Sequence, residues 1–422
     1  MNILVLGSGG REHSICWSIS KSKNCKEIYC IPGNSGIAEI AKCVEINLKK
    51  KKLVYRFCLE KQIDLVVIGP ENLLEQGMTD YLSHKGISVF GPNRRASKLE
   101  TSKTFSKKFM KKHNIPTANY KSFDTLVKSK KYIENISLPI VIKVDGLASG
   151  KGVIICKTKK KANNELKEIF INKKFGEAGK KILIEDFLEG FELSYFTFID
   201  KTSSLNLGYA LDHKKKYDND KGPNTGGMGA FSPSPKISRR LLETINTNII
   251  QPTITGIRKD NLNYKGVLFF GIMQTKNGPK VIEYNSRFGD PECQTILRRF
   301  DGDLLEILYA TAKDNLNRCT IKLSSDYSVC IVLASKGYPK KYKKKIIIKN
   351  LKNIKNSQHI YVFHSATTKI KDNYYSDGGR VLSITSRHSS IQNARKNAYN
   401  LIKKINWKNG FFRKDIGLKN IK

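Results

Sequence analysis

The chain has 422 residues, of which 39% are hydrophobic, and carries a formal net charge of +39 at pH 7. Its length suggests roughly two to four domains, and its apolar content argues against a disordered chain. No run approaches the roughly 18 apolar residues of a membrane-spanning helix, and the first residues lack the basic region of a signal peptide. We therefore expect no membrane partner.

The spacing of the cysteines and the distribution of the lysines indicate the compartment of the protein and its kind of partner. The nine cysteines form no CxxC pair, and the nearest two are Cys25 and Cys30. This pattern fits a cytoplasmic protein without disulfide bonds or a zinc site. The lysine excess raises the alternative of a basic nucleic-acid-binding protein, which would lose binding steeply as salt rises. However, the lysines are spread along the chain beside no base-reading motif, so we expect no nucleic-acid partner.

The first hundred residues alternate between strand and helix patterns. Short apolar runs closed by Gly or Pro predict strands at residues 2–6, 27–31, 65–69 and 87–91. This order is typical of a parallel sheet with functional loops at the carboxyl ends of its strands. The segment "GSGGREH" (residues 7–13) fails the dinucleotide fingerprint because Glu12 replaces its third glycine. What remains is either a tight βα turn with a structural role alone, or a turn with free backbone N–H groups that can hold an anion such as phosphate.

A glycine-rich hairpin follows a predicted helix. The helix is expected over residues 94–115, before Pro116. Residues 138–156 then read as two strands joined by a glycine-rich tip. The spacing differs from a Walker loop, so we expect a β-hairpin that folds over phosphates, with Lys143 on its first strand pointing to the same place.

The remaining elements are predicted from their turns. Residues 181–200 form two strands broken at Glu189 and Gly190, and residues 265–285 form a hairpin that turns at Asn277 and Gly278. The uncharged segment "GPNTGGMGAFSPSP" (residues 222–235) suits neither helix nor strand. The last hundred residues are expected to form a separate lobe, with strands at 327–334, 360–367 and 379–385 and a helix at 390–405.

The sharpest chemical pattern is "VIEYNSRFGDPE". Glu283 and Asn285 are two residues apart on a predicted strand, so their side chains share one face. A carboxylate and an amide oxygen suit a hard cation such as Mg²⁺, which keeps waters and binds phosphate oxygens. Arg287 follows two residues later, where it would approach a phosphoryl group in transfer.

With these motifs in place, the chain resembles the phosphoribosylamine–glycine ligases, a family of ATP-grasp enzymes in purine biosynthesis. The resemblance covers nearly the whole chain, from "LGSGGREH" through "VIKVDGLASGKGV" to "GGRVLSIT". The segments "GPNTGGMGA" and "RFGDPE" are the most specific, whereas the glycine-rich hairpin is shared by ATP-grasp enzymes in general.

The resemblance implies an α/β (α+β) protein of three parts. These are a Rossmann-like domain (1–100), an ATP-grasp domain (101–325) whose lid covers about 120–190, and a small C-terminal domain (326–422). It further implies a cytoplasmic monomer that uses ATP with Mg²⁺ or Mn²⁺ to join glycine to 5-phosphoribosylamine through glycyl phosphate. The alternative within the superfamily is a ligase or carboxylase of another purine intermediate, against which "GPNTGGMGA" argues.

The resemblance also implies roles for single residues. Those implied for ATP are Lys103 and Lys143 on the phosphates, Gly150, Lys151 and Gly152 at the lid tip, Glu185 to Leu188 at the adenine hinge, and Glu192 on the ribose. Glu283 and Asn285 match the metal ligands, and Gly271 occupies the place of a further acid. Arg287 and Lys103 are the implied catalytic residues. Implied substrate contacts are Gly9, Gly10, Glu71 and Arg380 for phosphoribosylamine, together with Asp212, Gly226, Gly227 and Asp290. The segment 222–235 is expected to pack against glycine and to donate N–H groups to its carboxylate.

Overall fold

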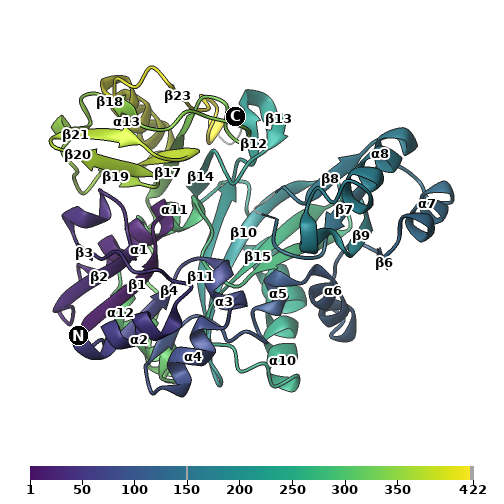
Figure 1. Ribbon diagram of the computed structural model, residues 1–422, viewed down its shortest axis with the longest axis horizontal. Helices are drawn as coiled ribbons and strands as arrows, with labels where there is room; N and C mark the ends of the chain where they lie inside the picture. The colour runs from purple at the N-terminus through teal and green to yellow at the C-terminus, as the bar shows by residue number, and fades with distance from the viewer. Residues whose placement is uncertain (149–150, 419–422) are drawn as a thin grey trace.

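The structure is a computed structural model that describes residues 1–148 and 151–418. Figure 1 shows an N-terminal region in purple, a lobe of blue strands that projects from the body, and a large sheet that continues into the yellow C-terminal part. This arrangement confirms the predicted α/β fold class, with a Rossmann-like parallel sheet at the N-terminus.

A five-stranded parallel sheet forms the N-terminal region, in the order β3-β2-β1-β4-β5. Its strands are β1 (Asn2–Gly7), β2 (Glu27–Pro32), β3 (Lys42–Cys43), β4 (Leu65–Ile68) and β5 (Val89–Phe90), and its helices are α1 (Gly10–Ile19), α2 (Lys51–Glu60), α3 (Glu71–Glu75) and α4 (Met78–His84). The four predicted strands are present, whereas the two-residue β3 was not predicted. Since α1 follows β1 and α3 follows β4, both helices begin at the carboxyl edge of the sheet.

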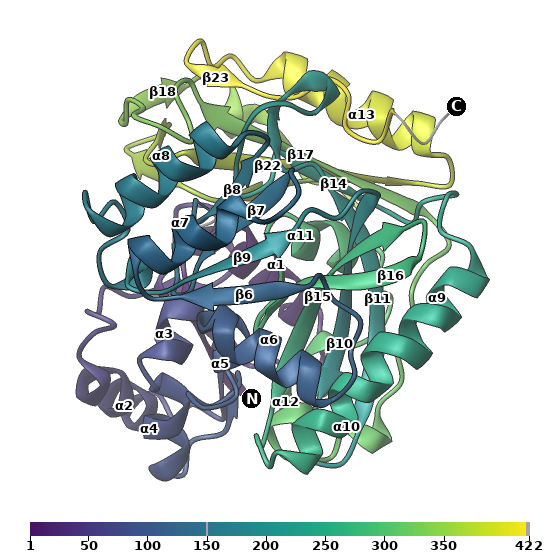
Figure 2. The ribbon, with the colours of Figure 1, turned by 90° about the vertical axis from the view of Figure 1, so that its right-hand side faces the viewer.

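The projecting lobe is built on a four-stranded sheet in the order β6-β9-β7-β8. Its elements are β6 (Tyr120–Phe123), α7 (Leu126–Glu134), β7 (Ile140–Val144), β8 (Val153–Cys156), α8 (Lys159–Phe170) and β9 (Ile182–Asp186). Side chains of α7 and α8 pack with those of β7 and β9 in one apolar cluster, and Figure 2 shows both helices along this sheet. The predicted hairpin of β7 and β8 is confirmed, but Gly150 lies outside the described residues.

A nine-stranded sheet forms the body, in the order β16-β15-β10-β11-β14-β17-β22-β19, with β23 beside β17. Its strands are β10 (Phe191–Ile199), β11 (Ser204–Asp212), β14 (Gly229–Ser232), β15 (Gly266–Thr275), β16 (Gly278–Asn285), β17 (Tyr327–Ser335), β19 (Ile360–His364), β22 (Arg380–His388) and β23 (Gly410–Phe411). Because β14 pairs with β17, one sheet contains strands from both sides of the predicted boundary between residues 325 and 326. The last hundred residues thus share a sheet with the central part of the chain, and their division into a separate domain stays a prediction.

The other elements cover this sheet or connect its strands. The helices are α5 (Lys98–Thr101), α6 (Lys103–Lys112), α9 (Arg239–Ile245), α10 (Gln251–Lys259), α11 (Glu292–Leu297), α12 (Leu304–Ala312) and α13 (Ile391–Lys404), and the strands of two small sheets are β12 (Lys215–Tyr217), β13 (Lys221–Asn224), β18 (Ile346–Ile348), β20 (Thr367–Ile370) and β21 (Asn373–Ser376).

Three predicted elements differ from the structure. The helix expected over 94–115 breaks at Ser102, which is extended (φ −133°, ψ 107°), because the Thr104 N–H donates to the Asp145 carboxylate (2.6 Å). The hairpin of β15 and β16 turns one residue earlier than predicted, over residues 276–277. The segment 222–235, expected to contain no strand, holds the end of β13 and all of β14, whose backbone is paired on both sides.

Candidate active site

Two lysines singled out in the sequence, Lys103 and Lys143, lie near the start of α6 and on β7. The Nζ of Lys143 donates to the carbonyl oxygen of Ile282 (3.0 Å) and forms an ion pair with Glu185 (2.9 Å). Burial lowers the pKa of Lys103; Glu283 opposes this shift, and the charge of Lys143 adds to it. Both ammonium groups therefore lie near residues 282 and 283 of β16, and two cations close together are what a polyphosphate needs.

A third lysine, Lys107, belongs to the same group and was missed in the sequence. Its Nζ lies 3.1 Å from the Glu185 carboxylate, which also holds Lys143, and all three side chains are at most 4% exposed. Burial lowers the pKa of Lys107 to about 8. Lys107 is four residues after Lys103, so both lie on one face of α6, and this spacing was the available signal.

The segment expected to be a hinge connects the two antiparallel sheets. β9 ends at Asp186 and β10 begins at Phe191, so residues 187–190, which include Leu188, join the lobe to the body. Gly190 has φ +155°, and a Cβ there would lie 1.9 Å from the Gln274 carbonyl oxygen, so only glycine fits.

Glu192, the second residue of β10, forms an ion pair with Lys214 (2.7 Å). Burial lowers the pKa of Lys214, but Glu192, Glu283 and Asp212 outweigh this effect and raise it. Lys214 therefore stays charged, because it lies among the carboxylates of Glu192, Glu283 and Asp212. Sequence reasoning did not single out Lys214, whose partners are remote in the chain.

The predicted cation ligands Glu283 and Asn285 lie on β16, and Gly271 on β15 pairs with Glu283, as the spacing predicted. Burial raises the pKa of Glu283, but Lys214 and Lys143 are foremost among the cations that bring it below its usual range. Within residues 1–148 and 151–418, this carboxylate forms no hydrogen bond or ion pair. An ionised carboxylate with free oxygens, beside an amide oxygen, fits a hard cation.

A fuller metal site is absent from the described residues: no group of three or more His, Cys, Asp or Glu side chains is placed to hold an ion. The pair on β16 thus fits a cation only together with oxygens from water or substrate.

Arg287 is held by two carboxylates rather than pointing freely at the site. Its guanidinium forms ion pairs with Glu71 (3.0 Å) and Glu100 (3.0 Å), and Glu100 also accepts from the Ser286 N–H (2.7 Å). Its Nη2 lies 3.5 Å from the Asn285 amide oxygen. Glu71 was expected to contact substrate, and in this structure its carboxylate is paired with Arg287. Glu100 was not singled out in the sequence, because its partner is 187 positions away, at residue 287.

The two carboxylates on Arg287 have opposite pKa shifts. Arg287 lowers the pKa of Glu71 to about 2, whereas burial raises the pKa of Glu100 to about 7. Since Glu100 binds its proton more tightly in the folded chain, its contribution to stability falls as pH rises from its ordinary 4.5 to about 7.

We therefore expect the Glu100→Gln variant to show a flatter dependence of unfolding free energy on pH between 5 and 7. The difference from the parent is about 3 kcal/mol at most. Urea unfolding at pH 5, 6, 7 and 8 measures it. Glu71→Gln is the matched control: the contribution of Glu71 is complete above pH 4.5 and is lost only toward pH 2, so this variant should shift the curve without changing its slope. Parallel curves for the parent and Glu100→Gln would contradict the prediction.

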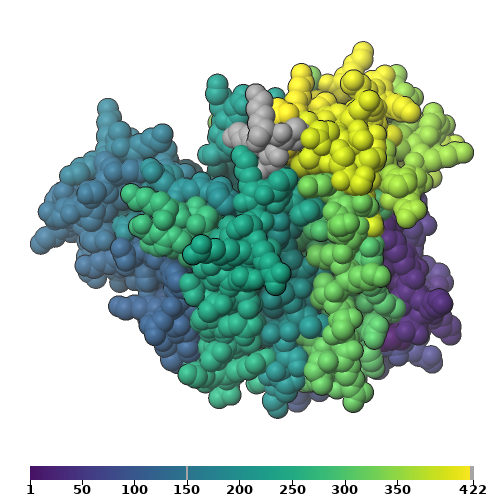
Figure 3. Space-filling model, turned by 180° about the vertical axis from the view of Figure 1, so that it is seen from behind, coloured from purple at the N-terminus to yellow at the C-terminus, as the bar shows by residue number. Residues whose placement is uncertain are grey.

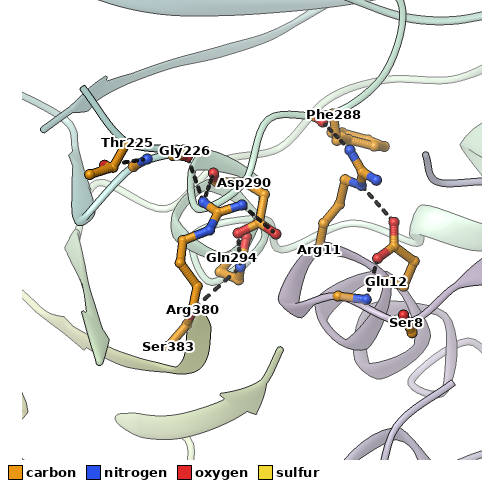
Figure 4. A network of polar contacts seen from close by, with 12 residues as sticks. Ser8, Arg11, Glu12, Thr225, Gly226, Phe288, Asp290, Gln294, Arg380 and Ser383 are labelled. Carbon is orange, nitrogen blue, oxygen red and sulfur yellow. Dashed lines mark hydrogen bonds and ion pairs between the residues drawn. The ribbon is translucent and has the colours of Figure 1, made fainter. Parts of the chain in front are cut away.

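Arg380 joins the glycine-rich segment to the helix α11 region. Figure 4 shows its guanidinium between the carbonyl oxygens of Gly226 and Asp290, with the Asp290 carboxylate 3.4 Å from its Nη2. Gln294 donates to the same carboxylate (2.8 Å). Burial raises the pKa of Asp290, but Arg380, the Gln294 hydrogen bond, Arg11 and Arg287 together outweigh it, so the pKa lies below the usual range.

Three predicted glycines meet at this network and leave no room for side chains. A Cβ on Gly9 would lie 2.9 Å from the Glu12 carboxylate and 3.4 Å from that of Asp290, and one on Gly10 would lie 2.5 Å from the Gln294 amide nitrogen. Gly227 has φ +112°, a conformation that favours glycine. The structure thus brings together loops from the N-terminal sheet and from the large sheet.

The N–H groups expected to bind anions are already used. The Gly9 N–H donates to the Glu12 carboxylate (2.6 Å), so the first turn holds a carboxylate of the chain itself rather than free donors. The Gly226 N–H donates to the Tyr338 hydroxyl (2.9 Å), and the Gly227 N–H to a threonine hydroxyl (3.1 Å). These three N–H groups are therefore not free donors: Glu12 and the threonine lie close by in sequence, and only Tyr338 is remote.

Arg11 and Glu12 form a second polar pair beside this network. Arg11 Nε donates to the Glu12 carboxylate (2.7 Å), and its Nη1 to the Phe288 carbonyl oxygen (3.1 Å), as Figure 4 shows. A Cβ on Gly69 would lie 2.0 Å from the Glu12 carboxylate, which explains the glycine after β4.

Asp212, at the end of β11, has a buried oxygen (Oδ1) with no hydrogen-bond partner among the described residues. Burial, and next the neighbouring Glu292, raise the pKa of Asp212 well above its usual range. A Cβ on Gly227 would lie 3.0 Å from this oxygen, so the carboxyl group faces the glycine-rich segment. Such a group suits a positively charged ligand.

Comparison with known proteins identifies the family. Models of phosphoribosylglycinamide synthetase match the chain along most of its length: the N domain at residues 1–100, the ATP-grasp (A) domain at 101–293 and the C domain at 328–419. The chain belongs to the phosphoribosylglycinamide synthetase family. The resemblance seen in the sequence, and the expectation of a ligase of this family, are confirmed.

Individual members of the family match over their full lengths. The phosphoribosylamine–glycine ligase of Agrobacterium fabrum is 43% identical over 417 residues, which cover 99% of this chain and 98% of the relative. That of Caldanaerobacter subterraneus is 40% identical over 416 residues, with 99% of each chain covered. The crystal structure of the Thermotoga maritima phosphoribosylamine–glycine ligase superposes with a TM-score of 0.85 at 29% identity, covering 99% of this chain and 100% of that one.

The fold is also found outside the family. The biotin carboxylase domain of the Hydrogenobacter thermophilus 2-oxoglutarate carboxylase, solved with MgADP and bicarbonate, has a TM-score of 0.74 at 16% identity. It covers 97% of this chain and 91% of that chain. In the part of the chain that the structure describes, no helix is long and apolar enough to cross a membrane.

Proposed function

We propose that the chain joins glycine to 5-phosphoribosylamine, coupled to cleavage of ATP to ADP and phosphate, and so acts in purine biosynthesis. The observation that carries this proposal is the group formed by Glu283, Asn285, Lys103 and Lys143 beside the network around Arg380. The group around Glu283 suits a polyphosphate with a bound metal ion. The network around Arg380 suits a small zwitterion, such as glycine, and a sugar phosphate. The full-length match to phosphoribosylamine–glycine ligases supports it.

In the first proposed step, a carboxylate oxygen of glycine attacks the γ-phosphorus of ATP, and ADP leaves with glycyl phosphate formed. Lys103 and Lys143 bind the phosphate oxygens, and Arg287 lies beside the γ-phosphate, so the chain supplies position and positive charge. Asp212 takes the glycine ammonium with its unpartnered oxygen. Glu192 binds the ribose of ATP, residues 185–188 contact the adenine through their backbone, and Lys151 and Gly152 belong to the lid.

In the second step, the amine of phosphoribosylamine attacks the acyl carbonyl, loses a proton, and expels phosphate. Arg287 would stabilise the charge on the carbonyl oxygen. Gly9, Gly10, Glu71, Asp290 and Arg380 surround the place for the sugar phosphate. No covalent bond to the chain is needed.

A divalent cation, Mg²⁺ or Mn²⁺, would be held by Glu283 and Asn285, and when bound it neutralises phosphate charge. The remaining features, a monomer in the cytoplasm without a nucleic-acid partner, are part of the same proposal.

The test measures ADP release with glycine, Mg²⁺ and phosphoribosylamine formed in the cuvette from ribose 5-phosphate and ammonia, omitting each component in turn. ADP formation that requires both glycine and the sugar amine is the expected result. ADP formation that continues without glycine would assign the chain to another acceptor, such as a different purine intermediate.

Gly227→Ala is expected to raise the KM for glycine about tenfold or more. A Cβ at this position would lie 2.5 Å from the Pro291 ring and 3.0 Å from Asp212, so the segment must shift where glycine is proposed to bind. Gly278→Ala is the matched control, because Gly278 has a similar φ of +96° but nothing within 4 Å of its Cβ. Both variants should lose about 1–2 kcal/mol of stability. An equal KM for glycine in the two would count against this placement.

A further inference from the structure

A cavity of about 480 Å³ lies where the N-terminal, central and C-terminal parts of the chain meet. Its lining residues are Trp17, Lys21, Arg298, Phe300, Asp301, Gly302, Asn356, Ser357, Gln358, Tyr361 and Arg387. Figure 3 shows the purple N-terminal part, the green part around residue 300 and the yellow-green C-terminal part side by side on one face. No residue of the proposed active site lines the cavity.

The cavity lies at the carboxyl ends of two helices that begin at the active site. α1 starts at Gly10 and α11 starts two residues after Asp290. Lys21 comes two residues after the end of α1, and Arg298 directly follows α11. The two helices contact one another through the Ser14 hydroxyl. The cavity is therefore a separate place, connected to the active site by packed elements.

Arg298 is a buried cation that forms no ion pair within the described residues. It is 4% exposed, and its Nη2 donates only to the backbone carbonyl oxygen of Gln358. Its Nε is buried and has no hydrogen-bond partner among the described residues. Burial, and next the charge of Arg387, lower the pKa of Arg298 to about 10. An uncompensated buried guanidinium costs free energy that an anion in the cavity would recover.

Lys21 is the second cation without an ion pair within residues 1–148 and 151–418. Its side chain is exposed, and its Nζ lies 3.1 Å from the centre of the Trp17 ring. The Arg298 guanidinium carbon lies 4.9 Å from the same ring. Trp17 thus places both cations beside one another at the cavity.

Asp301 at the cavity and the nearby Asp326 form no ion pair with these two cations within residues 1–148 and 151–418, although burial lowers the pKa of Lys21 and the charge of Asp301 opposes this shift. Asp301 lies 2.8 Å from Arg387 Nη1, and Asp326 lies 2.9 Å from its Nε. Both are engaged by Arg387, so Lys21 and Arg298 keep donors that no carboxylate of the described residues occupies.

We propose that this cavity binds a small phosphate monoester through Lys21 and Arg298. A monoester carries close to two negative charges at pH 7 and has three oxygens that accept hydrogen bonds from both cations, whereas a carboxylate offers one charge. The volume is within the range of small-molecule sites and leaves room for a sugar or nucleoside beyond the phosphate. Ser357 and Asn356 supply polar groups for that part.

The test uses the fluorescence of Trp17, since the chain has only two tryptophans and the other, Trp407, is in the C-terminal part. The parent and its Trp17→Phe variant are titrated with ribose 5-phosphate, AMP, inorganic phosphate and acetate. We expect a saturable change with a phosphate ester that is absent in Trp17→Phe. Acetate should give none, and inorganic phosphate should bind more weakly than the ester.

Variants separate this cavity from the active site, where the same esters can bind. Lys21→Gln, at an exposed position, should weaken ester binding about tenfold, and Arg298→Lys should also weaken it. Lys103→Met changes the active site and should leave the Trp17 signal unchanged. A signal lost in Lys103→Met but kept in Lys21→Gln would overturn the proposal. Equal binding of acetate and ester, or no saturable change with any phosphate, would do so as well.

Discussion

Arg287→Met is expected to lower kcat by about 10²–10³-fold at saturating substrates. The guanidinium is fixed by Glu71 and Glu100 at 3.0 Å each, so it needs no reorganisation when negative charge develops beside it. Steady-state ADP release, with glycine and sugar amine both present, measures the loss. Arg239→Met is the control for removing an arginine, because that side chain is 94% exposed and lies on α9.

The variant also leaves a buried carboxylate without its cation, so stability must be separated from catalysis. The double variant Arg287→Met/Glu100→Gln removes the second charge and should recover stability without recovering turnover. Turnover close to the parent value in either variant would refute a catalytic role for Arg287. A kcat that recovers together with stability would show that the arginine acts only on the fold.

Glu185→Gln is expected to cost about 3–5 kcal/mol of unfolding free energy, because it leaves Lys107 and Lys143 buried without a counter-charge. Their Nζ atoms lie 3.1 Å and 2.9 Å from the carboxylate that is removed. Since Lys143 is proposed to bind the ATP phosphates, the KM of the Glu185→Gln variant for ATP should rise as well. Urea unfolding and ATP titration measure the two effects.

Two further variants test whether the loss of stability in Glu185→Gln comes from the unpaired buried lysines. Glu243→Gln removes the partner of exposed Arg239 and should cost less than about 1 kcal/mol. Glu185→Gln/Lys107→Met removes one of the two unpaired charges and should regain part of the lost stability. A cost for Glu185→Gln as small as that for Glu243→Gln would show that the buried group does not hold α6 against the lobe.

The sequence predicted those features that depend on neighbouring residues. The strands of the parallel sheet, the hairpins and the shared face of Glu283 and Asn285 follow from apolar runs, turn residues and strand period. Ser102 could not be recognised as a helix break, because the cause is Asp145, a residue directly after β7 and 43 positions from Ser102.

The site residues that were missed share one property. Glu100, Lys107 and Lys214 are ordinary charged residues in sequence, and only their partners in other elements make them part of the site. The same holds for the N–H group of Gly226, whose acceptor is Tyr338, whereas the acceptor of the Gly9 N–H, Glu12, is only three residues away. Spacing can indicate which side chains share a face, but not which donors are already occupied.

The pairing of β14 with β17 determines how the chain can be cut into fragments for expression. A fragment that ends at residue 325 would lose β17 and expose β14, with the backbone groups of Gly229 to Ser232 unpaired along its open edge. Such an edge invites pairing with another molecule, so the shortened chain would aggregate. The C-terminal fragment would carry the complementary edge on β17. Each fragment would thus expose a strand edge that the whole chain keeps paired, so we expect the whole chain to be more soluble than either fragment.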